Sequence, residues 1–123
     1  ALVGAWYEIM SVMSKDDDAG KAARTAMAKA SGTDLAGYDA QLASTRMFYD
    51  PADAVDFVTS PALAKTMKYV AQFSFDHGLL GEGAPDAGFV GIAFPDGTVQ
   101  GSEDNVKLRF DAEYMRMAAE GNL

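Results

Sequence analysis

Cysteine is absent from this sequence of 123 residues. Its absence excludes thiol catalysis, disulfide bonds and thiolate metal sites, although it does not fix the cellular compartment. Basic residues are also scarce, because ten Lys and Arg face 18 Asp and Glu and leave a net charge of -8. Since a phosphate backbone is bound by clustered cations, we expect no nucleic-acid partner.

Long apolar runs and a signal peptide are missing as well. No run reaches the roughly 20 apolar residues that span a bilayer, and no stretch has the pattern of a signal peptide. Hydrophobic residues nevertheless make up 49% of the chain and charged residues 23%. These values are typical of a folded globular domain and not of a disordered one.

Catalytic signatures are also missing. There is no Gly-x-Ser-x-Gly turn, and the glycines at 78, 81 and 83 lack the Lys-Ser/Thr of a phosphate loop, so they predict a turn. His77, the only histidine, could act as a general base with Asp76. A place in the last turn of a helix, favoured by the helix dipole, is the simpler interpretation. We expect neither catalytic activity nor a cofactor.

The acidic run Asp16–Asp18 has the carboxylates of a cation site but not its spacing. A calcium loop counted from Asp16 needs Gly at its sixth position and Glu at its twelfth, where this chain has Lys21 and Met27. Helix capping and solvation explain the run instead. We expect no metal site.

Capping and breaking residues divide the chain into about six helices and a short hairpin. Asp17 or Asp18 is expected to cap the second helix, Thr33 or Asp34 the third, and Asp50 the fourth. The predicted helices span 1–13, 18–31, 34–43, 50–59, 61–77 and 111–120, and the predicted strands 89–94, 98–100 and 106–110. The fold class is therefore helix-rich α+β. We expect residues 1–123 to form a single fragment of a larger protein, in which 1–88 are helical and 89–123 form a hairpin followed by a last helix.

Apolar spacing predicts the buried faces of two helices. Leu2, Trp6, Ile9 and Met13 follow one face of the first helix, with Val3 and Met10 beside them, and we expect Trp6 to lie in the core. On the helix over 61–77 the expected buried residues are Leu63, Met67, Val70 and Phe73.

The first helix lacks an N-cap, so we expect the natural protein to extend before Ala1 and to carry its export signal there.

The segment from Thr45 to Tyr49 is expected to be an extended connector between helices. Its Arg46 could pair with a carboxylate or a sulfonate, and Phe48 or Tyr49 could stack on a ligand. The alternative is structural: Met47 and Tyr49 pack in the core while Arg46 pairs with Asp50. The residues alone favour this structural alternative.

Two stretches carry a resemblance to a known family. The run LASTRMFYDPADAVDFVTSPALAKTMKYVAQFSFDHGLL, over 42–80, resembles the C-terminal portion of substrate-binding proteins of the nitrate/sulfonate/taurine ABC-importer family. The tail FVGIAFPDGTVQGSEDNVKLRFDAEYMRMAAEGNL, over 89–123, resembles more narrowly a branch associated with urea carboxylase, the putative urea transporters. The opening AWYEIMSVMS is similar to the helix with which such chains return to their first lobe.

The resemblance implies a two-lobed α/β periplasmic-binding-protein fold, of which this chain is the C-terminal portion. It implies an exported, periplasmic protein that delivers a small polar solute, such as urea, nitrate or a sulfonate, to ABC permease subunits. By position on the connector, the resemblance carries over Thr45, Arg46 and Phe48 as solute-binding residues. It leaves open which solute is bound.

Two other functions remain open from the sequence. A free-standing helical domain could bind a protein partner through its exposed helix faces, and a fragment of an enzyme from a pyrimidine-precursor branch could share the fold. The enzyme would need an upstream nucleophile or acid–base pair. Because the predicted strands are too few to cover the helices, we also expect the isolated chain to form a homodimer or a swapped oligomer.

Overall fold

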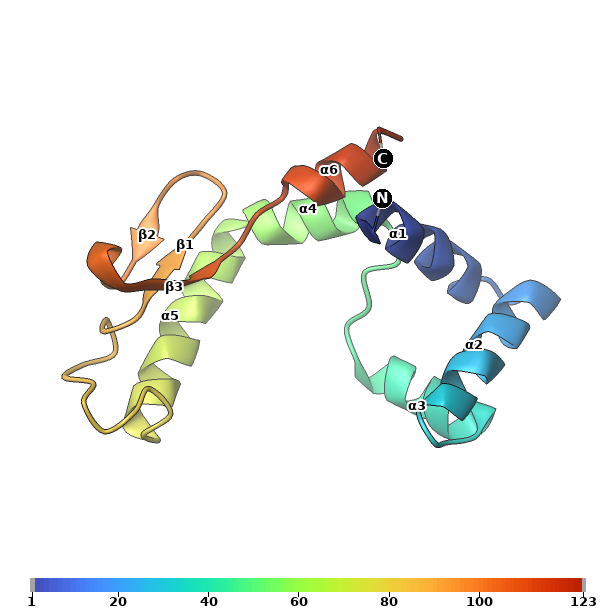
Figure 1. Cartoon of the computed structure of the whole chain (residues 1–123), viewed down its shortest axis with the longest axis horizontal. Coiled ribbons are helices and arrows are strands. Elements are labelled where there is room, and N and C mark those ends of the chain that lie inside the picture. Colours follow the sequence, from blue (N-terminus) through green and yellow to red (C-terminus); the bar gives the residue numbers. More distant parts are fainter. Residues whose placement is uncertain (1, 123) are drawn as a thin grey trace. The chain divides into compact units, whose positions relative to one another are not determined.

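A computed structural model of the chain describes residues 2–122 and confirms a helix-rich α+β class. Within that range it contains six α-helices and one three-stranded sheet (Figure 1). The chain divides into two compact units. One comprises the residues up to Ala54 together with those from Tyr114 on, and the other comprises Val55–Glu113. No helix in the described range combines the length and the apolar character that crossing a bilayer requires.

The observed elements lie within a few residues of the predicted ones. The helices are α1 (Leu2–Met13), α2 (Asp18–Ala30), α3 (Leu35–Ser44), α4 (Pro51–Thr59), α5 (Pro61–Asp76) and α6 (Glu113–Ala119). The strands are β1 (Gly91–Ala93), β2 (Val99–Gln100) and β3 (Val106–Arg109), with a 3-10 turn η1 (Glu103–Asn105) before the last strand.

The helix starts are made by the expected side chains. Carboxylate oxygens of Asp17, Asp34 and Asp50 each accept a hydrogen bond of 2.8 Å from a backbone N–H two or three residues further on. The Ser60 hydroxyl, which was not among the predicted caps, accepts one of 3.1 Å from the Ala62 N–H at the start of α5. At the other end of α5, Gly78 has a φ of 69°, in the left-handed region that favours glycine after a helix.

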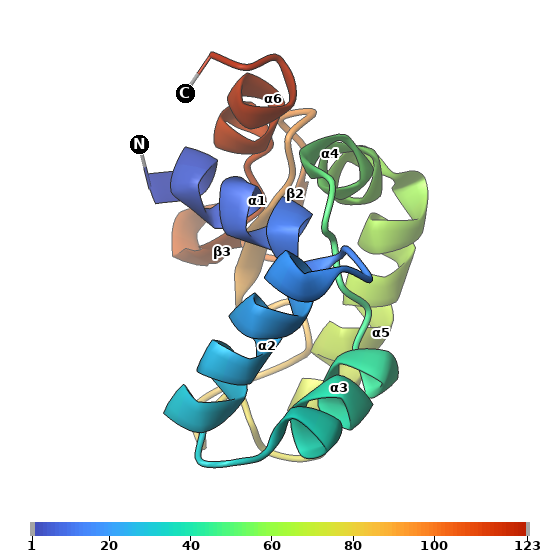
Figure 2. The same cartoon turned by 90° about the vertical axis from the view of Figure 1, so that its right-hand side faces the viewer.

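In the first unit, α2 lies against α1 on one side and α3 on the other. Figures 1 and 2 both show α2 and α3 side by side. The buried side chains here include Met10 and Met13 of α1 and Ala28 of α2. Burial of these apolar side chains is the main favourable contribution to packing of the three helices.

The close approach of α2 to the end of α1 depends on Gly20. A Cβ atom at position 20 would overlap the Lys15 carbonyl oxygen and lie 2.9 Å from that of Val12. Both obstacles are backbone atoms, which cannot swing aside as a side chain would. Glycine is therefore required here by space, since a helix interior otherwise favours alanine.

The predicted buried face of α1 is wrong in part. Leu2, Trp6 and Ile9 are 84%, 56% and 45% exposed, whereas Met13, assigned to the same face, is buried together with Met10. Trp6 is therefore not a core residue in the described structure. The reason is that α1 is apolar around most of its circumference, and α2 covers only the stripe that carries the two methionines.

The second unit contains the sheet, whose strand order is β2-β1-β3. The antiparallel β1–β2 pair, with Ile92 opposite Gln100, confirms the predicted hairpin. The strand predicted at 106–110 is also present, but it pairs with β1 in parallel, with Ile92 opposite Leu108. The sequence did not predict this parallel pairing, so the observed unit is a small mixed sheet and not a hairpin alone.

The η1 turn connects β2 to β3 and lies close against the start of β1. The Ser102 N–H donates to the Gly88 carbonyl at 2.8 Å, and the Asn105 amide donates to the Phe89 carbonyl at 2.8 Å. A Cβ atom at Gly91 would overlap the Ser102 carbonyl. The absence of a side chain at 91 thus allows β3 to lie beside β1.

The predicted buried face of α5 is also wrong in part. Leu63 is buried, but Val70 and Phe73 are 39% and 45% exposed. Strands of two to four residues present too little apolar area to cover a helix of 16 residues. The C-terminal half of α5 therefore keeps apolar side chains in contact with water.

We predict that Gly20→Ala lowers the free energy of unfolding by about 1–3 kcal/mol, because the new methyl group displaces backbone. The same change at an unobstructed helix position raises it by about 1 kcal/mol. Urea unfolding followed by circular dichroism measures the effect. Gly83→Ala is the control, since a Cβ atom there meets nothing within 4 Å. A stabilised Gly20→Ala variant would contradict the steric account.

Candidate functional site

Arg24 of α2 joins three elements of the first unit. Its Nη1 donates hydrogen bonds to the carbonyl oxygens of Met13, at 2.8 Å, and Lys15, at 2.9 Å. Its Nε donates to Oδ1 of Asp39 on α3 at 3.0 Å, and the Arg24 side chain is only 15% exposed. We call Arg24, Asp39 and these two carbonyl groups the Arg24 clamp.

The clamp supplies hydrogen-bond donors to carbonyl groups at the end of α1. The last carbonyl groups of a helix have no partner within it and carry the negative end of its dipole. The guanidinium of Arg24 supplies both hydrogen-bond donors and a positive charge at the end of α1. Gly20 and Ala28, four residues before and after Arg24, are both buried. Their small size lets α2 lie close enough for the guanidinium to reach α1.

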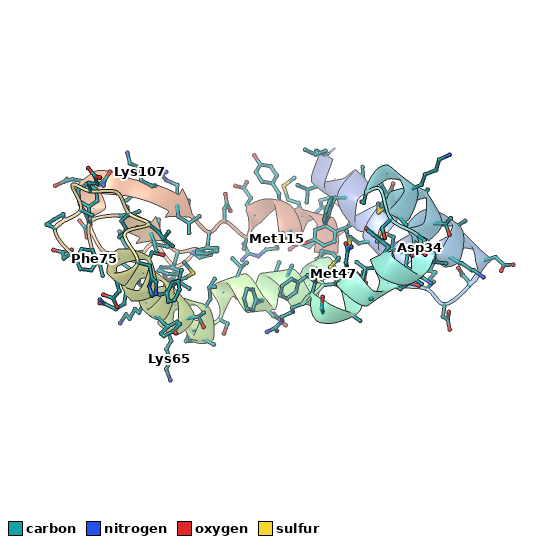
Figure 3. The ribbon with its side chains drawn as sticks, turned by 90° about the horizontal axis from the view of Figure 1, so that it is seen from below. Asp34, Met47, Lys65, Phe75, Lys107 and Met115 are labelled. Atoms are coloured by element: carbon teal, nitrogen blue, oxygen red, sulfur yellow. The ribbon has the colours of Figure 1, made fainter. Side chains whose placement is uncertain are left out.

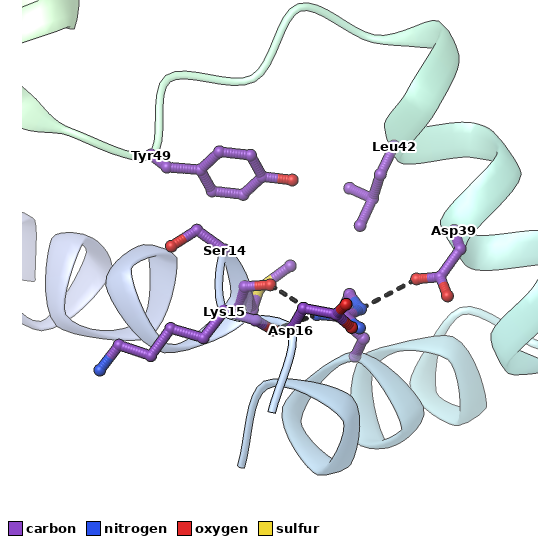
Figure 4. Close-up of a pocket in the computed structure, with 8 residues that line it drawn as sticks. Ser14, Lys15, Asp16, Asp39, Leu42 and Tyr49 are labelled. Carbon is purple, nitrogen blue, oxygen red and sulfur yellow. Dashed lines mark hydrogen bonds and ion pairs between the residues drawn. The ribbon is translucent and has the colours of Figure 1, made fainter. Parts of the chain in front are cut away.

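A pocket of about 270 Å³ opens beside the clamp. It is open to solvent, and all its lining residues belong to the first unit (Figure 4). They are Met13, Ser14, Lys15, Asp16, Arg24, Asp39, Leu42 and Tyr49. The end of α1, the face of α3 and the connector after α3 thus form its walls.

The pocket offers more hydrogen-bond acceptors than free donors. Figure 4 shows the Tyr49 hydroxyl pointing toward Leu42, whereas the Lys15 ammonium points away from Leu42 and Asp39. The carboxylates of Asp16 and Asp39 stand at the rim, and Asp39 is 44% exposed. Within the described part of the chain the Tyr49 hydroxyl makes no hydrogen bond. The arrangement suits a small polar molecule that donates hydrogen bonds.

The three residues predicted to bind a solute lie on the connector but do not line this pocket. The Thr45 hydroxyl donates to the Gln41 carbonyl at 2.9 Å, so only its lone pairs remain for a ligand. The Arg46 guanidinium lies over the Phe48 ring, 5.2 Å from its centroid, as a cation–π pair. Tyr49, the alternative stacking residue, does line the pocket. The assignment of Thr45, Arg46 and Phe48 to a binding site stays a prediction.

Sequence reasoning missed Arg24 and Asp39. A usable signal was present, since Arg24 stands between two small residues at four-residue spacing in an alanine-rich helix. A long cation flanked in this way on one helix face can reach across a close helix contact. Asp39 had no such signal, because its pairing joins residues 15 apart that meet only after folding.

His77 and the acidic run occupy the structural roles that the sequence favoured. His77 caps α5, with its Nδ1 2.8 Å from the Phe73 carbonyl oxygen and its ring stacked 3.9 Å from the Phe73 ring. Asp17 caps α2. Among residues 2–122 no group of three His, Asp or Glu side chains is arranged to hold a metal ion.

The pKa of Tyr7 in α1 is affected by Asp50, at the end of the connector. Partial burial raises the pKa of the Tyr7 phenol above its usual 10.0, and the nearby carboxylate of Asp50 raises this pKa further. Asp50 also starts α4 through its bond to the Ala52 N–H. The end of the connector therefore lies close to α1 in the first unit.

Comparison of the chain with protein-family models, curated proteins and solved structures finds no significant match.

We predict that Arg24→Met lowers the free energy of unfolding by about 2 kcal/mol, because the part-buried Met13 carbonyl and the Lys15 carbonyl lose a charged donor. Asp39→Asn, which removes the charge but keeps an acceptor, should cost less than about 1 kcal/mol, because that carboxylate is well exposed. Urea titrations of both variants measure the difference. Arg116→Met, at an exposed position, is the control. Equal losses for Arg24→Met and Asp39→Asn would show that the ion pair, and not the carbonyl bonds, matters most.

We predict that Tyr7 contributes to alkaline unfolding. Because its folded-state pKa is raised, the folded state retains the proton longer than the unfolded state does. The resulting stability is fully present below pH 10.0 and is lost as the pH rises through the folded-state pKa. In Tyr7→Phe the free energy of unfolding should fall less steeply above this pH, and Asp50→Asn should weaken the dependence. An unchanged slope in Tyr7→Phe would refute this origin.

Proposed function

We propose that the chain is the C-terminal part of an extracytoplasmic substrate-binding protein of the nitrate/sulfonate/taurine importer family. In this role it helps to hold a small polar solute and to deliver it to ABC permease subunits. The observation that carries the proposal is the connector after α3. It lies in the stretch with the family resemblance, and its Tyr49 forms one wall of an open pocket of about 270 Å³. That volume suits a solute smaller than a drug-sized ligand.

The residues that carry the resemblance have defined structural roles, which supports the proposal. Asp50 caps α4, Pro61 occupies the first turn of α5, and Gly78 has the left-handed conformation that ends this helix. The similarity over 42–80 therefore rests on residues that set helix boundaries. Such boundaries would be kept in a protein with the proposed two-lobed periplasmic-binding-protein fold.

The connector also presents a pre-organised cation. Stacking of Arg46 on Phe48 restricts the guanidinium before any ligand arrives, which lowers the entropy that binding would cost. Arg46 is exposed and Phe48 is half-buried. An anionic solute such as nitrate or a sulfonate would be bound by Arg46 outside the pocket, with Thr45 and Phe48 beside it, whereas the acceptor-rich pocket suits a hydrogen-bond donor such as urea.

The exposed apolar face of α1 supports a chain that normally contacts more protein. Glu8 is the sole charged residue of α1, and helices that are apolar all round are usually buried. In the proposed protein the remainder of the first lobe covers this face. A homodimer of the isolated chain would cover it in another way.

The second candidate is a free-standing helical domain that binds a protein partner. The observation in its favour is the same exposed stripe of Leu2, Trp6 and Ile9. Light scattering and binding of a hydrophobic dye separate the two functions. A chain that belongs in a larger lobe should bind dye or self-associate, whereas a native adaptor should be a well-behaved monomer or a defined dimer.

The native size and compartment of the protein test the transport proposal. We expect an antibody against this chain to detect a band well above 13.0 kDa in the osmotic-shock fluid of the source cells. A cytoplasmic marker enzyme serves as the control for lysis. A band of 13.0 kDa confined to the cytoplasm would exclude the transport function and leave the helical interaction domain.

Solute binding tests the predicted site. Calorimetry of the chain with taurine, nitrate and urea as probes should give binding of an anionic probe that Arg46→Gln weakens by about tenfold, because a charge-assisted hydrogen bond is lost. Arg116→Gln changes the net charge equally at another exposed position and should bind like the parent chain. Equal affinities of the Arg46→Gln variant and the parent chain would remove Arg46 from the site.

A further inference from the structure

The outer edge of β3 is open for strand pairing. β3 stands at one end of the β2-β1-β3 order, so one side of the strand bonds to β1. In the part of the chain that the structure describes, no strand pairs with its other side. Alternate residues of a strand direct their N–H and C=O groups to opposite sides. β3 therefore presents unpaired backbone donors and acceptors along this edge, which we call the β3 edge.

Two basic residues belong to the strand that forms the β3 edge. Lys107 and Arg109 flank Leu108 on this strand, and Lys107 lies where the register against β1 shifts by one residue, between the pairs Gly91–Val106 and Ile92–Leu108. Both are exposed, and within residues 2–122 neither forms an ion pair or a side-chain hydrogen bond. Figure 3 shows Lys107 pointing away from α5. In a chain with a net charge of -8, this is a local positive site.

The cations exclude a second copy of the chain from this edge. An antiparallel pair of two β3 strands around Leu108 would bring Lys107 of each copy close to Arg109 of the other. Like charges directly opposite each other on one face destabilise a strand pair. A lysine on an edge strand commonly serves only to prevent aggregation. Here the strand has four residues, and such shortness already limits unwanted pairing.

We propose that the β3 edge binds an extended acidic segment of another protein by strand addition. The segment supplies backbone hydrogen bonds to the open edge and carboxylates that pair with Lys107 and Arg109. Leu108, 39% exposed, stands between the two cations in the sequence and offers an apolar contact. This interaction surface is separate from the pocket and goes beyond the proposed function.

Fluorescence anisotropy of a labelled peptide with alternating Glu and Val tests the charge requirement on the full chain. At physiological ionic strength we expect saturable binding, weakened about tenfold in the double variant Lys107→Gln/Arg109→Gln, since two opposite-charge pairs are lost. Lys65→Gln/Lys68→Gln is the matched control, because it removes the same charge from exposed positions of α5. Equal weakening in both double variants would overturn the proposal, because it would show dependence on net charge alone.

Changes to the peptide test strand addition without altering the protein. A peptide in which Gln replaces Glu should lose affinity, and so should one with N-methyl groups on alternate residues, because it cannot donate to the strand edge. If the N-methylated peptide binds as tightly as the parent peptide, strand addition is wrong. Tighter binding to vesicles of anionic lipid than to the peptide would also overturn the proposal and identify a lipid surface as the partner.

Discussion

The Arg24 clamp is the contact on which the first unit depends. One guanidinium of 15% exposure joins the end of α1, the middle of α2 and, through Asp39, the face of α3. A cation with little exposure to water is costly unless its donors are used, and here Nη1 and Nε of Arg24 donate to carbonyl and carboxylate oxygens. The same contact places Met13 and Asp39 at the pocket wall. The geometry of the pocket therefore depends on how α1 ends. Gly20 makes possible the close approach of α2 to that end.

Local chemistry explains why the helices were predictable and their buried faces were not. Asp17, Asp34 and Asp50 cap helices by bonds to residues two or three positions away, so the sequence contains all partners of these interactions. Burial of Trp6 or Phe73, by contrast, depends on what covers the helix. An apolar periodicity shows that a face can be buried, but it does not supply the covering surface. The parallel pairing of β3 with β1 was missed for a similar reason, because it is formed across the intervening hairpin.

The candidate site shows the same division between local and distant information. The connector was recognised because its composition and flanking caps are local, and Tyr49 does reach the pocket. Arg46 and Phe48 are near neighbours, and they stack on each other as part of the same short segment. The pocket itself was not predicted, since its walls come from segments up to 36 positions apart, from Met13 to Tyr49. A solute would contact both parts. One is the pocket wall that the Arg24 clamp holds in place, and the other is the extended connector with its polar side chains.

Native-state hydrogen exchange of Arg24→Met, compared residue by residue with the parent chain, tests the central claim most directly. If the clamp holds the first unit together, amides of α1, α2 and α3 lose protection in common, because the three helices open as one cooperative group. Amides of the strands β1 to β3, which belong to the other unit, keep their protection. Loss confined to the helical turn around residue 24 would contradict the account, because it would show that the clamp stabilises α2 alone.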